Sequence, residues 1–426
     1  MKQNSLPSHK NYFGYLFFVI LILLSFSTLK VGGIRFSQLL LILTAFLFLA
    51  NDYSIKKNDY SILLFMLFGA IGMTLVSLNS SFGKVGEIKF IIKYFLIFPA
   101  TFYVGAKMIQ KVGIKKLAFI FEIVAFIYAL VAYMIAFLPI PESILNLIVH
   151  YRTGFGGSQY LDFQGTFFEA GWFALATVSM LVAAFLIRYE FKIWPKKRIY
   201  LLFLYLFVSV ALLLSKNKTI WVALILIGFI LIVLKTVMLL IYSNQYKYDH
   251  KHPIIKRLSA INPIKTTLAI LFTIFLLVGI NELLTEPIFS TAMLEEKLEH
   301  ERGKAFSVVL KLLEDSSWLG GYGFGFVEYY FSTMPFEIMG LGEGSGMVFN
   351  SYLDIWLSAS LLGLIFHILI LIFSISGRYY FTLVLPLLYF IFANFNPAIG
   401  DEYYYLFLGL SYGIIQKYVK KRESYA

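Results

Sequence analysis

The chain has 426 residues, of which 59% are apolar and only 14% are charged. A soluble domain carries far more charge, so this composition excludes an ordinary soluble enzyme. The formal net charge is +12, and the absence of cysteine excludes a disulfide framework and a thiolate metal site or nucleophile.

Apolar residues come in blocks of roughly twenty, the length that crosses a hydrocarbon core of about 30 Å as a helix. A transmembrane β-barrel would instead alternate over segments of about ten residues, and no such segments appear in the sequence. We predict one all-α transmembrane domain over 1–426, in which the first helix is not cleaved as a signal peptide. The expected crossings, twelve in number, are 12–29, 36–50, 60–78, 88–106, 117–138, 166–187, 199–214, 220–242, 267–280, 351–374, 379–394 and 402–418.

Lysine and arginine predict the orientation of the helices. With the N-terminus in the cytoplasm, 24 of the 36 basic residues fall on the cytoplasmic side, and both termini are cytoplasmic. The two large outer loops are then 139–165 and 281–350, and we expect them to form the active-site face. The inner basic residues are explained by topology and by anionic lipid headgroups, so nucleic acid is not an expected partner.

The second outer loop holds three unlike segments. A charged and helical run is predicted for 293–303. An amphipathic helix is predicted for 304–315, because Phe306, Val309, Leu310 and Leu313 recur on one face. Glycine-rich turns follow at 320–325 and 340–346, and since no strand precedes them they are not a dinucleotide fingerprint. We expect them to let the backbone pass close to a neighbour or a ligand, with plain turn chemistry as the alternative.

Basic residues on the outer side are candidates for chemistry, because membrane insertion disfavours cations there. Snorkelling to lipid headgroups is the alternative explanation for each of them. Together they would suit a diphosphate, which arginine binds with two hydrogen bonds and lysine as a point charge. The candidates are Lys89, Lys93, Arg152, Lys216, Lys218 and Arg302.

Two further polar positions stand at the starts of apolar helices. Glu169 is expected about one turn inside its helix, where it could interact with the helix N-terminus, orient or deprotonate a hydroxyl group, or pair with an outer cation. Asn350 and Ser351 could cap the next helix, with Ser351 and Asp354 spaced as a capping box. The histidines lack ligand spacing, so no metal site is predicted.

The order of these features resembles the O-antigen polymerase and O-antigen ligase superfamily of bacterial inner membranes. The resemblance covers roughly 150–370. It rests on five segments: Gly165-Thr-Phe-Phe-Glu169; Leu214-Ser-Lys-Asn-Lys-Thr-Ile-Trp221; Arg302 with its amphipathic helix; Ser317-Trp-Leu-Gly-Gly-Tyr-Gly-Phe-Gly325; and Asn350-Ser-Tyr-Leu353 running into Leu361-Leu-Gly-Leu-Ile365.

The resemblance implies a polymerase of undecaprenyl-diphosphate-linked oligosaccharide repeats, active at the periplasmic face without metal or other cofactor. A hydroxyl group of the next lipid-linked repeat would attack the anomeric carbon of the growing chain, and the diphosphate would leave. A separate chain-length regulator is an expected partner, besides the lipid bilayer. The implied roles are leaving-group binding by the six cations, with Arg302 also catalytic; acceptor activation by Glu169; and sugar positioning by Asn350, Tyr322 and Tyr352.

Other activities are compatible with the same helix pattern. A ligase of the superfamily carries a histidine just before the asparagine, where this chain has Phe349. A flippase or secondary transporter would show interrupted helices in two corresponding halves and charges near the midplane. A peptidoglycan-type glycosyltransferase shares a large outer loop, but its motifs find no convincing match.

Overall fold

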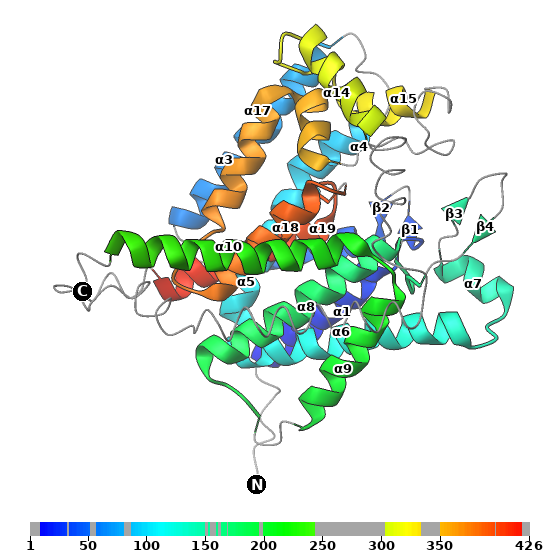
Figure 1. Cartoon of the computed structure of the whole chain (residues 1–426), viewed down its shortest axis with the longest axis vertical. Coiled ribbons are helices and arrows are strands. Elements are labelled where there is room, and N and C mark those ends of the chain that lie inside the picture. The colour runs from blue at the N-terminus through cyan, green and yellow to red at the C-terminus, as the bar shows by residue number, and fades with distance from the viewer. Residues whose placement is uncertain are drawn as a thin grey trace.

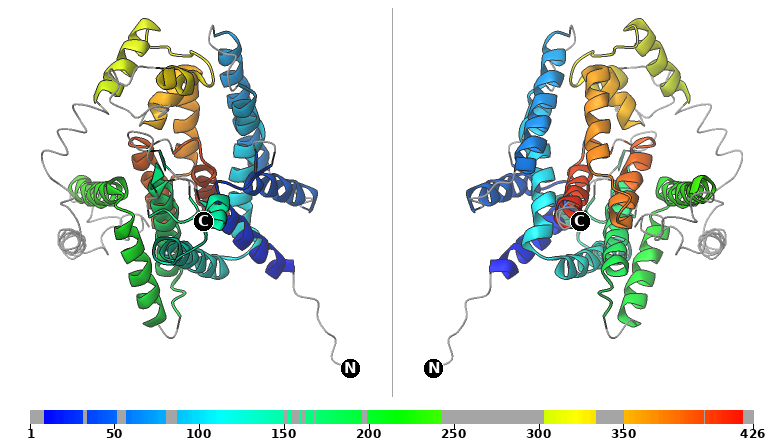
Figure 2. Two further views of the ribbon diagram at one scale, coloured as in Figure 1. Left: turned by 90° about the vertical axis from the view of Figure 1, so that its right-hand side faces the viewer. Right: turned by 90° about the vertical axis from the view of Figure 1, so that its left-hand side faces the viewer.

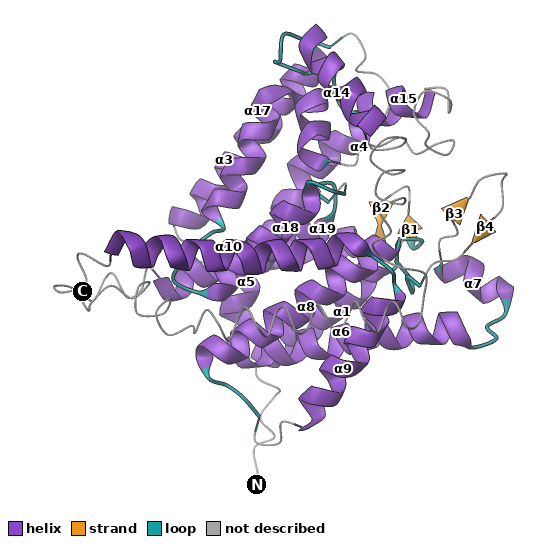
Figure 3. Cartoon of the chain, viewed as in Figure 1, coloured by secondary structure: helices purple, strands orange, loops and turns teal. Residues whose placement is uncertain are grey.

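The structure is a computed structural model that describes 9–31, 34–51, 57–80, 87–149, 152–153, 159–160, 163–167, 169–195, 199–242, 303–333, 350–396 and 398–419. Helices dominate this part of the chain (Figure 3). Its strands are two short antiparallel pairs, β1 (Lys30–Val31) with β2 (Ile34–Arg35) and β3 (Arg152–Thr153) with β4 (Gln159–Tyr160). The prediction of an all-α fold is confirmed.

The helices follow one another with short connections where the chain is described (Figure 1). In chain order they are α1 (His9–Ser25), α2 (Phe36–Asn51), α3 (Lys57–Leu78), α4 (Glu87–Ile92), the π-helical η1 (Lys93–Ile97), α5 (Phe98–Lys111), α6 (Ile114–Phe137), α7 (Glu142–Ile148), α8 (Ala170–Phe191), α9 (Ile199–Leu214), α10 (Lys218–Tyr242), α14 (Gly303–Asp315), α15 (Phe326–Thr333), α17 (Ser351–Phe373), α18 (Tyr380–Ala393), α19 (Glu402–Ile414) and the π-helical η4 (Ile415–Val419).

Five helices in the described part are long and apolar enough to cross a membrane. They are Tyr60–Leu78, Ile88–Lys111, Ile114–Phe137, Ala170–Phe191 and Ser351–Phe373. Shorter apolar helices accompany them, so the protein is an all-α protein embedded in a membrane. The expected crossing at 267–280 lies outside the described residues.

The expected start of the sixth crossing, at 166, was wrong. Gly165 has φ +60°, and the amide of Phe167 donates to the carbonyl of Gln164 at 3.2 Å, so a tight turn occupies this stretch. The helix begins only at Ala170. Turn geometry at a glycine outweighs the apolar composition of the segment.

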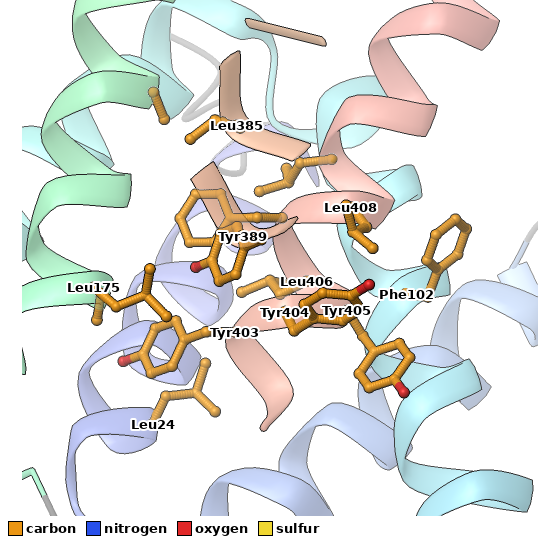
Figure 4. Close-up of a cluster of buried hydrophobic side chains, with 14 of the residues drawn as sticks. Leu24, Phe102, Leu175, Leu385, Tyr389, Tyr403, Tyr404, Tyr405, Leu406 and Leu408 are labelled. Carbon is orange, nitrogen blue, oxygen red and sulfur yellow. The ribbon is translucent and has the colours of Figure 1, made fainter. Parts of the chain in front are cut away.

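The closest helix packing joins α5 and α19. A Cβ at Gly409 would lie 2.1 Å from the carbonyl oxygen of Phe102, and one at Gly105 would lie 2.4 Å from that of Leu406. Glycine at these positions lets two backbones approach, as is common between membrane helices. Beside this contact Tyr403, Tyr404 and Tyr405 point in different directions into the core, with Tyr389 near them (Figure 4).

Helix ends that the charge pattern assigns to one side contact one another. On the predicted outer side, the hydroxyl of Thr166 donates to that of Ser25 at 2.9 Å, and the amide of Phe324 donates to the Ser77 hydroxyl at 2.9 Å. On the predicted inner side, Lys417 Nζ donates to the carbonyl of Ile109 at 2.9 Å. These three contacts join segments assigned to the same side; the number of crossings and their topology stay predictions.

Helix α17 is interrupted. Ala359 and Ser360 leave the helical conformation, with φ +65° at Ser360. The glycine-rich turn fills the break: Gly321 and Tyr322 donate to the carbonyl of Leu357 at 2.9 and 2.8 Å, respectively. The turn therefore satisfies backbone groups that the break would otherwise leave unpaired within an apolar segment.

Close approach explains the glycine at position 320. A Cβ there would lie 2.2 Å from the carbonyl oxygen of Trp356, and φ is +68°. The expectation that glycine lets this backbone pass close to a neighbour is confirmed. The second predicted glycine turn, at 340–346, and the charged run at 293–303 lie outside the described residues.

Helix α14 lies at one end of the molecule (Figure 2), where it packs against α17. It is amphipathic as predicted, and Val309 and Leu313 are fully buried against α15 and α17. Phe306, predicted for the same face, is half exposed. The buried part of the face is thus shorter along the helix than the apolar pattern indicates.

Candidate functional site

A buried cluster of charges joins the starts of α2 and α19. Arg35 Nη1 lies 3.0 Å from Glu402 Oε2 and 3.4 Å from Asp401 Oδ2. Gln38 Nε2 donates to Glu402 Oε1, and the amide of Arg35 donates to Gln38 Oε1 at 2.9 Å. The network fixes the β1–β2 hairpin against the first turn of α19.

Burial decides the electrostatics of this cluster. The Glu402 side chain is 1% exposed and that of Asp401 9%. Burial, together with the nearby Glu402 charge, raises the pKa of Asp401 to about 6, although Arg35 acts in the opposite direction. Glu402 and Asp401 hold the pKa of Arg35 above its usual value. Arg35 therefore stays charged beside two carboxylates.

Two predicted diphosphate-binding lysines lie on the α4–η1–α5 helix. Lys93 is the first residue of η1, and its Nζ donates to the carbonyl of Gly400 at 3.4 Å. It is within electrostatic range of Glu402, Asp401 and Asp354. Carboxylates of the protein thus compensate part of the Lys93 charge, which weakens its assignment as an anchor for an anion.

Lys89, one turn earlier, is the more accessible of the two. Its Nζ lies 3.7 Å from Glu328 Oε2 on α15, and both side chains are about 60% exposed (59% and 61%). An exposed pair at this distance is weak, because water solvates both partners. Lys89 can therefore exchange Glu328 for an anionic ligand at little cost.

A polar network surrounds the start of α17. Asn350 Oδ1 accepts hydrogen bonds from the amides of Tyr352 and Leu353 at 2.9 and 3.1 Å, so Asn350 is the N-cap. Its Nδ2 donates to Asn394 Oδ1 at the end of α18, at 3.3 Å. The expected capping by Asn350 is confirmed, and its amide also links two helices.

The expected capping box of Ser351 and Asp354 was wrong. Ser351 Oγ donates to the carbonyl of Asn396 at 2.7 Å and accepts from the amide of Ile399 at 3.3 Å, so it binds the α18–α19 connection. Asp354 Oδ1 accepts from Ser358 Oγ at 3.2 Å, one turn along α17. The Ser351 hydroxyl therefore makes tertiary hydrogen bonds, although the local spacing predicted that it would cap the helix.

Glu169 is the N-cap residue of α8 and does not lie a turn inside the helix. This correction follows from the turn that delays α8. The Glu169 side chain makes no capping hydrogen bond, although its carbonyl accepts from the amides of Trp172 and Phe173 at 3.1 and 3.2 Å. Its carboxylate is half-buried at the positive end of α8, where the helix dipole favours the charged form.

The α9–α10 turn adjoins the start of α8. Lys216 has φ +50° and an exposed side chain. A Cβ at Gly171 would lie 3.1 Å from Asn217 Nδ2 and 3.9 Å from the ring of Phe392, at the end of α18. The start of α8, the Lys216 turn and the end of α18 are therefore neighbours.

The two predicted sugar-positioning tyrosines have different surroundings. The Tyr322 hydroxyl donates to the carbonyl of Leu312 at 2.7 Å, and its ring stacks on Phe326 at 4.4 Å. Tyr352 is 7% exposed and packs against the ring of Phe390 at 5.4 Å. Both contacts stabilise the protein itself, and the role of these tyrosines in sugar binding stays a prediction.

The side chains of three predicted cations lie outside the described part of the structure. Arg302 lies outside the described residues. Arg152 is placed as backbone in β3, opposite Tyr160 of β4, and Lys218 is placed as the first residue of α10. Their roles also stay predictions.

Sequence reasoning missed Arg35, Gln38, Asp401 and Glu402 as a cluster. One signal was present in the sequence, because Asp401 and Glu402 form an adjacent acidic pair directly before an apolar segment. An acidic pair at that boundary needs a partner. Nothing local identifies that partner, because it lies at the other end of the chain.

The described residues hold no group of three or more histidine, aspartate and glutamate side chains that could bind a metal ion. Comparison of the chain with protein-family models, curated proteins and solved structures finds no match. The fold and the site therefore define the class by themselves: an all-α membrane protein with charged and polar side chains gathered at the ends of its apolar helices.

Proposed function

We propose that this protein is a membrane glycosyltransferase that polymerises oligosaccharide repeats carried on undecaprenyl diphosphate, at the periplasmic face of a bacterial inner membrane. The observation that carries the proposal is the meeting of motif segments remote in sequence. The start of α8, with Glu169, adjoins the turn that holds Lys216 and the end of α18. The end of α18 contacts Asn350, the N-cap of α17.

The reaction needs an accessible cationic surface and no redox chemistry. The sugar–phosphate bond of the donor breaks while an acceptor hydroxyl forms the new glycosidic bond, and the hydroxyl proton passes to a base. Cations stabilise the departing diphosphate, and fixed side chains orient the two lipid-tethered substrates. Lys216 and Lys89 are exposed and can approach phosphate oxygens directly, with Arg152, Lys218 and Arg302 as further candidates. Glu169 is the proposed base or acceptor-orienting group.

The interruption of α17 is the observation that favours a transporter. Broken helices in transporters present free backbone groups to a substrate or an ion. Here the segment around Gly321 and Gly323 occupies the carbonyls of Leu357 and Ser358, and the amide of Leu361 donates to the carbonyl of Leu319 at 2.8 Å. This break therefore serves to hold a loop, and the polymerase remains the better-supported proposal.

The glycan profile of cells that lack the gene tests the proposal. A single repeat left on the lipid core supports a polymerase. Loss of all repeats from the core, with polymer still present on the carrier lipid, would indicate a ligase. Single lipid-linked repeats retained in the cytoplasmic leaflet would indicate a flippase.

Variants of the outer cations test the site in the same cells. Arg302→Ala and Arg152→Ala should abolish polymerisation while the protein still inserts in the membrane, and Lys216→Arg should retain more polymer than Lys216→Ala. Lys311→Ala is the matched control, because Lys311 is an exposed cation on α14 to which no ligand is assigned. Ladders of normal length in the Arg302 and Arg152 variants would refute the site.

A further inference from the structure

Apolar side chains are exposed on the segment formed by α14 and the two residues Trp318 and Leu319. Phe306 is 50% exposed, Trp318 48% and Leu319 62%. None of them belongs to a helix long enough to cross a membrane. Large apolar groups exposed to water on one short segment would be unfavourable, so their exposure needs a partner.

Helix α17 indicates what covers them. After the break, its outward side carries exposed apolar residues over several turns, and in a membrane-embedded helix such a side faces lipid. These residues are Leu361, Leu362, Ile365, Ile368 and Ile372. We call them the α17 lipid stripe.

Trp318 and Leu319 adjoin the start of the α17 lipid stripe. The carbonyl of Leu319 accepts from the amide of Leu361, the first residue of the stripe, at 2.8 Å. The carbonyl of Trp318 accepts from Trp356 Nε1 at 2.9 Å, and the two indole rings are 6.3 Å apart. The exposed pair therefore continues the α17 lipid stripe past its first residue, at the break in the helix.

The polarity of α14 fits a position at the boundary between lipid and water. Its exposed polar residues lie together on one side of the helix, about 80° to 180° around the axis from Phe306 at 3.6 residues per turn. They are Ser307, Lys311, Glu314 and Asp315. Helices with one apolar and one charged side lie in the membrane interface, where tryptophan is also enriched.

We propose that α14 with Trp318 and Leu319 is an interfacial anchor, whose Phe306, Trp318 and Leu319 side chains enter the headgroup boundary of one leaflet while Lys311 and Glu314 face water. The partner is the bilayer itself. This inference rests on the fold and does not depend on the proposed glycosyltransferase activity. Because α14 follows Arg302 directly in the sequence, an anchored α14 would also tether that residue to the membrane surface.

Absence of cysteine from the chain makes the test direct. Single spin labels are placed through Leu319→Cys and Phe306→Cys in the full-length protein, reconstituted in phosphatidylcholine–phosphatidylglycerol liposomes. Lys311→Cys is the matched control on the polar side of α14, and Ile365→Cys is the control in the α17 lipid stripe. Power saturation then compares collision of each label with oxygen, which concentrates in lipid, and with a water-soluble nickel chelate.

The expected result is that labels at 319 and 306 collide more with oxygen than with nickel, at a depth shallower than the label at 365. The label at 311 should show the opposite preference. A label at 319 as accessible to nickel as that at 311 would overturn the inference. Protection of 319 from both reagents would overturn it too, because a protein surface would then cover the site.

Tryptophan fluorescence gives a second measurement that needs only one conservative change. The fluorescence lost in Trp318→Phe, relative to the unmodified protein, reports the Trp318 signal. That signal should be quenched by lipids brominated near the headgroup and only weakly by aqueous iodide. Quenching by iodide without quenching by bromolipid would contradict the anchor.

Discussion

Arg35, at the start of α2, and Glu402, the first residue of α19, form a buried ion pair at 3.0 Å although 367 positions separate them in sequence. The pair connects an early hairpin to the last apolar helix. It lies beside Lys93 and the N-cap Asp401, so four charged groups gather at this point.

Loss of Arg35 should destabilise the protein strongly. Arg35→Gln leaves Glu402, which is 1% exposed, without its main cationic partner, and removal of one member of a buried pair costs about 3–5 kcal/mol. The double variant Arg35→Gln, Glu402→Gln should recover part of that loss, because no buried charge is left unpaired. Unfolding in mixed detergent micelles measures the stability of both variants.

Glu328→Gln, in the exposed pair with Lys89, is the control and should change stability little. Equal effects of Arg35→Gln and Glu328→Gln would contradict the model of a buried pair.

Stability should fall as the pH rises through the titration of Asp401. The pKa of Asp401 is raised from 3.8 to about 6, so the folded state holds its proton more tightly than the unfolded state. This contribution is fully present below about pH 4 and is lost as the pH approaches and passes about 6, with a total of at most about 3 kcal/mol. Asp401→Asn keeps an oxygen that can accept from the amide of Tyr403. This variant should therefore remove the fall in stability between about pH 4 and 6. Thermal unfolding between pH 4 and 7 measures it; identical slopes in the two proteins would rule out this role of Asp401.

Packing of α5 on α19 should not tolerate a methyl group at position 409. Gly409→Ala puts a Cβ 2.1 Å from the carbonyl oxygen of Phe102, so the helices must separate, at a cost of about 1–3 kcal/mol. Gly400→Ala is the matched control, because a Cβ at Gly400 meets no atom within 4 Å. Unfolding midpoints of the two variants should differ clearly, and similar midpoints would mean that this interface can relax.

Asn350 has a capping role that can be separated from the proposed sugar binding. Asn350→Ala removes the acceptor for the amides of Tyr352 and Leu353 and should cost about 1 kcal/mol. Asn350→Ser restores an N-cap but not the amide that reaches Asn394. We expect Asn350→Ser to recover stability while the glycan ladder stays short. Full recovery of the glycan ladder in Asn350→Ser would mean that Asn350 acts only as a helix cap and does not bind sugar.

Local patterns in the sequence predicted much of the scaffold, since each depends on neighbouring residues. Apolar blocks predicted the helices, and the spacing of Val309 and Leu313 predicted the buried side of α14. Asn350 could be recognised as a cap for the same reason. Local spacing failed at Ser351, because an acceptor at Asn396 competes for its hydroxyl.

The sequence by itself determined the class of protein, because transfer of long apolar blocks out of water leaves only a membrane-embedded helical chain. Only the tertiary structure decided that Arg35 pairs with Glu402, that Lys93 is partly compensated by carboxylates, and that a glycine turn fills the break in α17. These outcomes depend on distances between remote segments, and electrostatic and hydrogen-bond energies at such sites are set by burial and geometry that no short window of sequence contains.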